Sequence, residues 1–186
     1  MDPRYYSAPV AQRPTKLSNK VVLGGIGLLL LVIFGVMLLA FSGGNNIGDQ
    51  ITRAVFRQQQ LITLTDDAKK NIRSAELMRI NADANLFLKS DLGTLTSLMA
   101  STGVEKVPKD IAAQEVDTTT KPRLEQALSS SRFDDTYKLV LSQKISSQQA
   151  LLSEIHPKVG DAQAQRSLSE IYNKLESVQK QLANLK

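Results

Sequence analysis

Few side chains in this 186-residue sequence have the type and spacing that catalysis or metal binding requires. The one histidine, His156, follows Glu154 by two positions, and residues two apart do not face the same way on a helix. A di-iron bundle needs glutamates from two helices and a Glu-x-x-His pair from each of two others. We therefore expect His156 to stand near a helix end, and we predict no metal ligand and no cofactor.

Two acidic pairs, Asp66-Asp67 and Asp134-Asp135, could in principle bind calcium or exchange protons with a substrate. Both pairs fall where helices are expected to start, and this placement favours helix capping. Serine is common, but no Gly-x-Ser-x-Gly context surrounds any serine, and no glycine-rich phosphate loop is present. The sequence thus predicts no catalytic residue, and we expect a protein that is not an enzyme.

Three polar residues lie close to the apolar faces of expected helices: Gln58, Asn81 and Asp91. Two interpretations remain open at this stage. The three side chains could form a buried polar pocket between helices, or the helices could simply be imperfectly amphipathic.

The C-terminal third of the chain carries the clearest helical periodicity. Apolar residues recur at intervals of three and four, which predicts one buried face on a helix over residues 164–185; they are Ala164, Leu168, Ile171, Leu175, Val178, Leu182 and Leu185. A second stripe predicts a helix over residues 133–155, with Gln148 as its one polar interruption; it consists of Phe133, Tyr137, Leu141, Ile145, Leu152 and Ile155.

Capping signals flank these two helices. Ser131 and Asp134 have the spacing of a capping box at the start of the first. Pro157 and Gly160 should end it, and Asp161 can cap the next helix. Because the turn between them is short, we expect the two helices to lie antiparallel.

Residues 49–101 predict two further helices, or one long bent helix. The better stripe comprises Leu77, Ala84, Leu88, Leu92, Leu95 and Met99, and the weaker one Ile51, Val55, Ile62 and Ile72. We place the break within residues 65–71, where Thr65 or Asp66 can cap, and we expect Gly103 to end the second helix. Beyond it no sustained stripe occurs until a short helix over 123–129, after Pro122.

Four amphipathic helices must bury their faces against one another, which predicts an all-α fold with a four-helix bundle. A helix of about 28 residues is about 42 Å long. The connector over residues 103–121 reaches about 60 Å when extended. It can therefore span the bundle and let the second and third helices run parallel, as in ferritin-like bundles, although an up-down bundle with a long loop remains an alternative.

Two stretches, "AELMRINADANLFLKSDLGTLTSLMASTGVEKVP" and "FDDTYKLVLSQKISSQQALLSEI", carry a family resemblance. With the long connector between them and a final helix after a short break, they resemble a family of exported bacterial ferritin-like domains of unknown function. The resemblance covers roughly residues 50–185 and implies an extracytoplasmic helical domain. Where many members carry histidines, this chain has Phe87-Leu88-Lys89-Ser90 and Ser146-Ser147-Gln148-Gln149.

An uncharged apolar run extends from Val21 to Phe41. Its 21 residues form about 31 Å of helix, close to the roughly 30 Å of a bilayer core, whereas the apolar region of a cleaved signal spans about 7–15 residues. Length therefore favours a membrane anchor, although Ala40-Phe41-Ser42 imitates a cleavage site. Residues 1–20 carry four basic residues and one acidic residue, which places the N-terminus in the cytoplasm and the C-terminal part outside.

The sequence thus predicts an all-α chain with four parts: a disordered cytoplasmic tail (1–20), a transmembrane helix (21–41), a linker (42–48) and an extracytoplasmic ferritin-like bundle (49–186). It has no cysteine, and its +5 net charge sits largely in the tail, so nucleic-acid binding is not expected. We predict a non-enzymatic interaction module of the cell envelope that contacts the bilayer through Val21–Phe41 and binds an envelope protein or a second copy. The alternative is a small-ligand or sensor bundle that works with a separate signalling partner.

Overall fold

The computed structural model describes residues 46–185, and the predicted tail and apolar run lie outside this range. This part of the chain is all-α and contains no strand; its elements are α2 (Ile47–Ala68), α3 (Ala75–Ser101), α4 (Lys109–Glu115), α5 (Thr120–Ser129), α6 (Phe133–Ile155), the 3-10 helix η1 (His156–Lys158) and α7 (Ala162–Asn184). None of these helices combines the length and the apolar character needed to cross a membrane.

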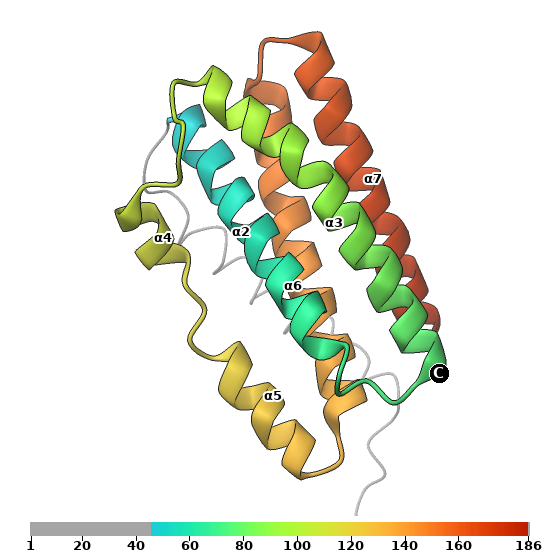
Figure 1. The fold of residues 1–186 in the computed structure, drawn as a ribbon. Coiled ribbons are helices and arrows are strands. Elements are labelled where there is room, and N and C mark those ends of the chain that lie inside the picture. The colour runs from blue at the N-terminus through green and yellow to red at the C-terminus, as the bar shows by residue number, and fades with distance from the viewer. Residues whose placement is uncertain (1–45, 186) are drawn as a thin grey trace, which may run out of the picture. The chain divides into compact units, whose positions relative to one another are not determined.

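Four long helices, α2, α3, α6 and α7, form a bundle (Figure 1). Helix α2 packs against α3 and α6, and α7 packs against the same two helices, so α2 and α7 occupy opposite corners. Short turns make α2 and α3 antiparallel, and likewise α6 and α7. Helices α3 and α6 run in the same direction, so the chain between them returns along the length of the bundle. This is the parallel arrangement of the second and third helices, not the up-down alternative.

The core lies between the four long helices and is built from the predicted stripes. Every apolar residue predicted for the α6 stripe is buried, and the α7 stripe is buried from Leu168 to Leu182. The α3 stripe is buried except for the half-buried Leu92. In the weaker first stripe Ile51 and Val55 are buried and Ile62 is half-buried, while Ile72 is buried from the turn after α2 rather than from a helix.

Helix α2 ends at Ala68, within the predicted stretch 65–71, but the prediction of Thr65 or Asp66 as a cap was wrong. Thr65 is buried inside α2, where its hydroxyl donates to the carbonyl of Leu61 at 2.9 Å. This bond to the preceding turn satisfies the hydroxyl without ending the helix. Ser74 is the actual N-cap of α3 and accepts a hydrogen bond from the Leu77 amide at 3.3 Å.

The predicted capping box of Ser131 and Asp134 is also absent. Ser131 has a φ of 58°, a left-handed conformation that turns the chain from α5 into α6, and Arg132 is the N-cap. The Asp134 carboxylate instead accepts from the amides of Arg73 and Ser74, at 3.1 and 2.7 Å. It therefore satisfies backbone donors at the start of α3, on another helix.

The turn between α6 and α7 follows the prediction. Helix α6 ends at Ile155, and Pro157 lies in η1. The Asp161 side chain caps α7 by accepting from the Ala164 amide at 2.7 Å.

The connector between α3 and α6, residues 103–131, is hereafter called the strap. It contains α4, which the sequence did not predict, and α5, which begins at Thr120 rather than at residue 123. Helix α4 buries only Ile111 and α5 only Ala127, so neither is long enough or apolar enough to produce a recognisable stripe. Helix α4 packs on α2, and α5 packs on α6.

Candidate functional site

Polar side chains occupy several positions inside the bundle. Gln58 and Asn81 are fully buried and Asp91 is nearly so, so all three side chains lie in the interior of the bundle. They do not form one pocket, however, because each pairs with a different partner. Five further polar residues are buried; they are Gln50, Thr52, Thr65, Asn85 and Gln148.

The first buried group joins α2, α3 and α6. The Tyr137 hydroxyl donates to Asn81 Oδ1, and Asn81 Nδ2 donates to the Thr65 carbonyl at 3.0 Å. Asn85 Nδ2 donates to Thr65 Oγ1 at 2.7 Å. Burial raises the pKa of Tyr137, so its hydroxyl stays protonated and remains a donor.

The second buried group is a pair of glutamines, Gln58 on α2 and Gln148 on α6. Gln148 Nε2 donates to the Ala54 carbonyl at 3.0 Å and to Gln58 Oε1 at 3.2 Å, and Gln58 Nε2 donates to the Leu88 carbonyl at 3.1 Å. Gln148 Oε1 is buried without a hydrogen-bond partner. Flipping the Gln148 amide would point its oxygen at two acceptors, so the observed orientation is the better of the two.

Asp91 pairs across the opposite side of the bundle with Lys174 on α7. The Lys174 Nζ lies 2.5 Å from Asp91 Oδ1, and the two side chains are 38% and 7% exposed. The ammonium group reaches solvent while the carboxylate is covered, so this ion pair ties α3 to α7.

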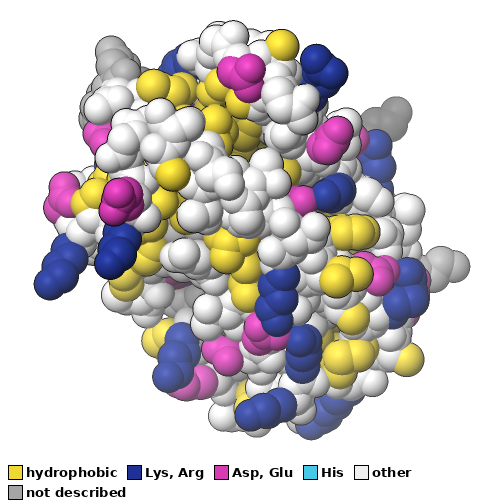
Figure 2. Space-filling model, turned by 45° about the horizontal axis from the view of Figure 1, so that its top comes forward, with side chains coloured by type: hydrophobic (Ala, Val, Ile, Leu, Met, Phe, Trp, Pro, Cys, Tyr) yellow, Lys and Arg dark blue, Asp and Glu magenta, His cyan; other side chains and the backbone are white. Residues whose placement is uncertain are grey.

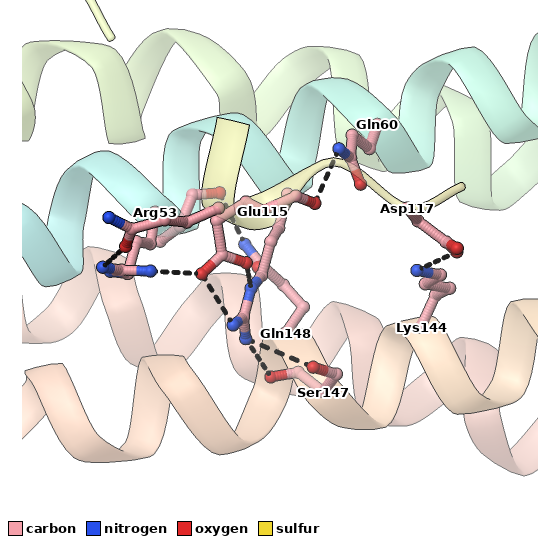
Figure 3. A network of polar contacts seen from close by, with 10 residues as sticks. Arg53, Gln60, Glu115, Asp117, Lys144, Ser147 and Gln148 are labelled. Atoms are coloured by element: carbon pink, nitrogen blue, oxygen red, sulfur yellow. Dashed lines mark hydrogen bonds and ion pairs between the residues drawn. The ribbon is translucent and has the colours of Figure 1, made fainter. Parts of the chain in front are cut away.

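A cluster of polar contacts, which we call the Glu115 clamp, holds the strap to the bundle (Figure 3). Arg53 Nη1 lies 2.7 Å from Glu115 Oε1, and Arg57 Nε lies 2.6 Å from Glu115 Oε2. A third bond runs from Arg57 Nη2 to Oε1 at 3.2 Å. The Glu115 carboxylate, at the end of α4, thus receives three N–H groups from two arginines that are one turn apart on α2.

The clamp is largely shielded from solvent. The side chains of Glu115, Arg53 and Arg57 are 8%, 17% and 12% exposed. Burial raises the pKa of Glu115, but hydrogen bonds and charge from Arg57 and then Arg53 outweigh it, so the pKa lies below its usual value. Arg57 Nη1 also donates to Ser147 Oγ of α6 at 3.2 Å. Gln60 donates to the Glu115 carbonyl at 3.0 Å.

Asp117 makes a second attachment two residues further along the strap. Its carboxylate lies 2.5 Å from Lys144 Nζ on α6 and accepts from the Thr119 amide at 2.7 Å. Thr119 Oγ1 and Thr120 Oγ1 also donate to this carboxylate. Burial raises the pKa of Asp117, but the hydrogen bonds from Lys144 and from the two threonines lower it by more than burial raises it. The pKa therefore lies below its usual value, and the carboxylate stays ionised.

In each acidic pair of the sequence, the two carboxylates do not bind a common partner. Asp66 binds Lys69 and Lys89 at 2.6 and 2.9 Å. The hydrogen bond from Lys69, followed by that from Lys89, lowers the pKa of Asp66 to about 2. Asp67 is exposed. In the second pair, Asp134 accepts backbone hydrogen bonds at the start of α3, whereas Asp135 is exposed.

His156 begins η1 and is half-buried at the end of α6. Glu154 does not pair with it; its carboxylate accepts from Gln50 Nε2 at 2.6 Å and from Lys158 at 3.0 Å. Within residues 46–185, no group of three or more histidine, aspartate or glutamate side chains could hold a metal ion.

A cavity of about 100 Å³ lies beside the turn from α5 into α6. It is lined by residues of both charges and by two apolar side chains; they are Arg73, Leu128, Ser131, Arg132, Phe133, Asp134 and Asp135. Exposed apolar side chains are distributed elsewhere as well: Leu86 is 66% exposed on α3 and Leu139 is 48% exposed on α6. On the face drawn in Figure 2, hydrophobic side chains gather in separate groups among charges of both signs.

Sequence reasoning missed the Glu115 clamp, although half of it was visible. Arg53 and Arg57 are four residues apart, so they share one face of α2. Their partner lies about 60 positions away in a segment without periodicity, and no local pattern points to it. No protein-family model, curated protein or solved structure matches this sequence.

Proposed function

We propose that this protein is a single-pass membrane protein whose helical bundle is an extracytoplasmic, non-enzymatic interaction module of the cell envelope. The observation that carries the proposal is the uncharged run from Val21 to Phe41, preceded by four basic residues. Its length suits a bilayer core of about 30 Å. The flanking charge favours a cytoplasmic N-terminus. The ligand-free role is supported by the interior, where the buried amides bind backbone carbonyls or other side chains and the buried Asp91 pairs with Lys174.

We further propose that the bundle is ferritin-like in its wiring, in line with the family resemblance. The parallel α3 and α6, joined by a strap along the bundle, support this assignment. Ferritin-like proteins with a di-metal site place glutamates and histidines in the bundle interior. Here the buried polar residues of the described range are amides, a tyrosine, two threonines and one carboxylate, Asp91, which pairs with Lys174. The proposed role is therefore binding through the surface, to an envelope protein or to a second copy of the chain.

The absence of cysteine from the sequence allows a direct test of topology. Gly160 is exposed, and a side chain built there meets no atom within 4 Å, so Gly160→Cys should fold normally. Ser18→Cys marks the N-terminal tail. We expect a membrane-impermeant maleimide to label Gly160→Cys on intact cells or spheroplasts and Ser18→Cys only after lysis.

Three outcomes of this experiment are distinct. Labelling of Ser18→Cys alone on intact cells would reverse the topology and refute the proposal. A Gly160→Cys chain recovered in the soluble exported fraction, with a mass that begins near Gly43, would mean that the apolar run is a cleaved signal. Labelling of Gly160→Cys in the membrane fraction, with full-length mass, supports the anchored module.

One observation favours the second candidate, a small-ligand or sensor bundle. The cavity beside Ser131 combines Arg73 and Arg132 with Asp134 and Asp135 and an apolar wall at Leu128 and Phe133. A thermal-shift screen of small charged and zwitterionic compounds, with Arg132→Ala as the matched control, would test this alternative. Stabilisation of the wild-type chain but not of the variant would favour it over the interaction module.

A further inference from the structure

Arg53 and Arg57 form a preorganised pair of cationic groups on one face of α2. Both side chains are mostly buried, at 17% and 12% exposed, and both point to the same carboxylate (Figure 3). Removing a guanidinium from water is costly unless an anion with suitable hydrogen-bond geometry replaces the lost hydration.

This end of the strap is attached to α2 mainly through polar contacts. In α4 only Ile111 is buried, and Val116, directly after Glu115, is 53% exposed. Besides the Glu115 carboxylate, which binds Arg53 and Arg57, Gln114 Oε1 accepts from Arg53 at 2.6 Å and the Glu115 carbonyl accepts from Gln60. A segment with few buried apolar contacts opens more readily than the core it covers.

We propose that Arg53 and Arg57 form a carboxylate-binding site that the strap occupies in cis through Glu115. When the strap lifts, the site accepts a carboxylate from another source, either an acidic side chain of a protein or a small free carboxylate. Arginine suits this ligand because its planar fork matches the two oxygens of a carboxylate. This carboxylate site can be tested on the purified chain, whether or not the apolar run anchors the protein in a membrane.

The test uses the full-length Glu115→Ala variant, with detergent in every sample. This substitution removes the atoms of an acetate ion and leaves the two arginines in place. We expect sodium acetate to raise the melting temperature of the variant in a saturable manner, toward that of the wild-type chain. Equal concentrations of sodium chloride and of neutral acetamide should not do so. If the variant is unfolded at room temperature, recovery of helical circular dichroism with acetate becomes the readout.

The double variant Glu115→Ala with Arg57→Ala is the matched control and should lose the response to acetate. An identical response to acetate and chloride, or an undiminished response in the double variant, would overturn the proposal. A second arm distinguishes the ligand sources: the wild-type chain is titrated with poly-L-glutamate while hydrogen exchange is followed in residues 109–120. Faster exchange confined to this segment supports displacement of Glu115 by a protein-borne carboxylate, and a response to acetate alone supports a small free carboxylate.

Discussion

The paired glutamines Gln58 and Gln148 place two amides in an interior that is otherwise largely aliphatic. Each amide nitrogen has an acceptor, but Gln148 Oε1 has no partner. An unsatisfied buried acceptor costs roughly 1–3 kcal/mol. The pair is therefore a poor source of stability, and its geometric effect is to link α2 and α6 at one register.

We expect the double variant Gln58→Leu with Gln148→Leu to be within about 1 kcal/mol of the wild-type free energy of unfolding, because it removes the polar atoms together. Gln148→Leu alone should be less stable than the double variant, since it leaves Gln58 Oε1 buried without its donor. Urea unfolding of the three variants, analysed as a double-mutant cycle, measures the coupling. Additive losses from the two single substitutions would contradict this account.

Asp134 illustrates how one side chain can be required by an element that is distant in sequence. Its carboxylate accepts from the amides of Arg73 and Ser74 at the start of α3. We expect Asp134→Ala to lower the free energy of unfolding by about 1 kcal/mol, as the loss of an N-cap does. Asp135→Ala is the matched control, because Asp135 is exposed, and it should change stability by less than about 0.5 kcal/mol. Equal effects would show that the bonds from the Arg73 and Ser74 amides to Asp134 do not stabilise the fold.

At the scale of elements, the strap is attached by charges more than by apolar burial. The pKa of Glu115 is lowered from its ordinary value of 4.5, so the ionised carboxylate stabilises the fold above about pH 5. That contribution is lost as the pH falls through the folded-state pKa. Asp117 shifts in the same direction, which gives the second attachment the same dependence on pH.

We therefore expect Glu115→Gln to cost about 2 kcal/mol at pH 7, because the hydrogen bonds to a charged group are weakened. The difference from the wild-type chain should shrink as the pH falls from 4.5, the ordinary pKa of Glu115 in the unfolded chain, through the lower pKa that it has in the folded chain. Urea unfolding of both chains from pH 7 to pH 3 provides the measurement. Glu105→Gln, at an exposed glutamate of the strap, controls for general charge effects. A difference that is constant with pH would argue against the ion pairs.

The long helices were predictable because periodic burial over many residues decides their faces, and Asp161 was predictable as a cap because capping is local. Thr65 was mistaken for a cap because its hydroxyl bonds to the preceding turn of α2 instead of ending the helix. Ser131 was mistaken for a cap because its backbone adopts a left-handed conformation in the turn before α6. The neighbouring sequence specifies neither arrangement. Helix α4 and the Glu115 clamp could not be predicted, since they depend on contacts between segments about 60 residues apart.

At the scale of the whole bundle, the wiring determines what the strap must do. Helix α3 ends at one end of the bundle and α6 begins at the other, so the connection has to cover the length of α3. The 27 residues of α3 correspond to about 40 Å. The strap is long enough to span this distance, and it makes two polar attachments on the way. A tight turn would instead make α6 antiparallel to α3.

We predict that replacing residues 104–131 with four glycine and serine residues prevents the chain from forming this bundle by itself, because such a link spans only about 14 Å. Helices α6 and α7 would then have to come from a second chain, so the variant should associate by exchange of helices or aggregate. Insertion of four residues after the exposed Thr118 is the matched control and should cost less than about 1 kcal/mol. Analytical ultracentrifugation of the full-length chains in detergent distinguishes these outcomes. If the shortened variant kept the wild-type mass and stability, a connection that spans the length of α3 would not be required for the fold.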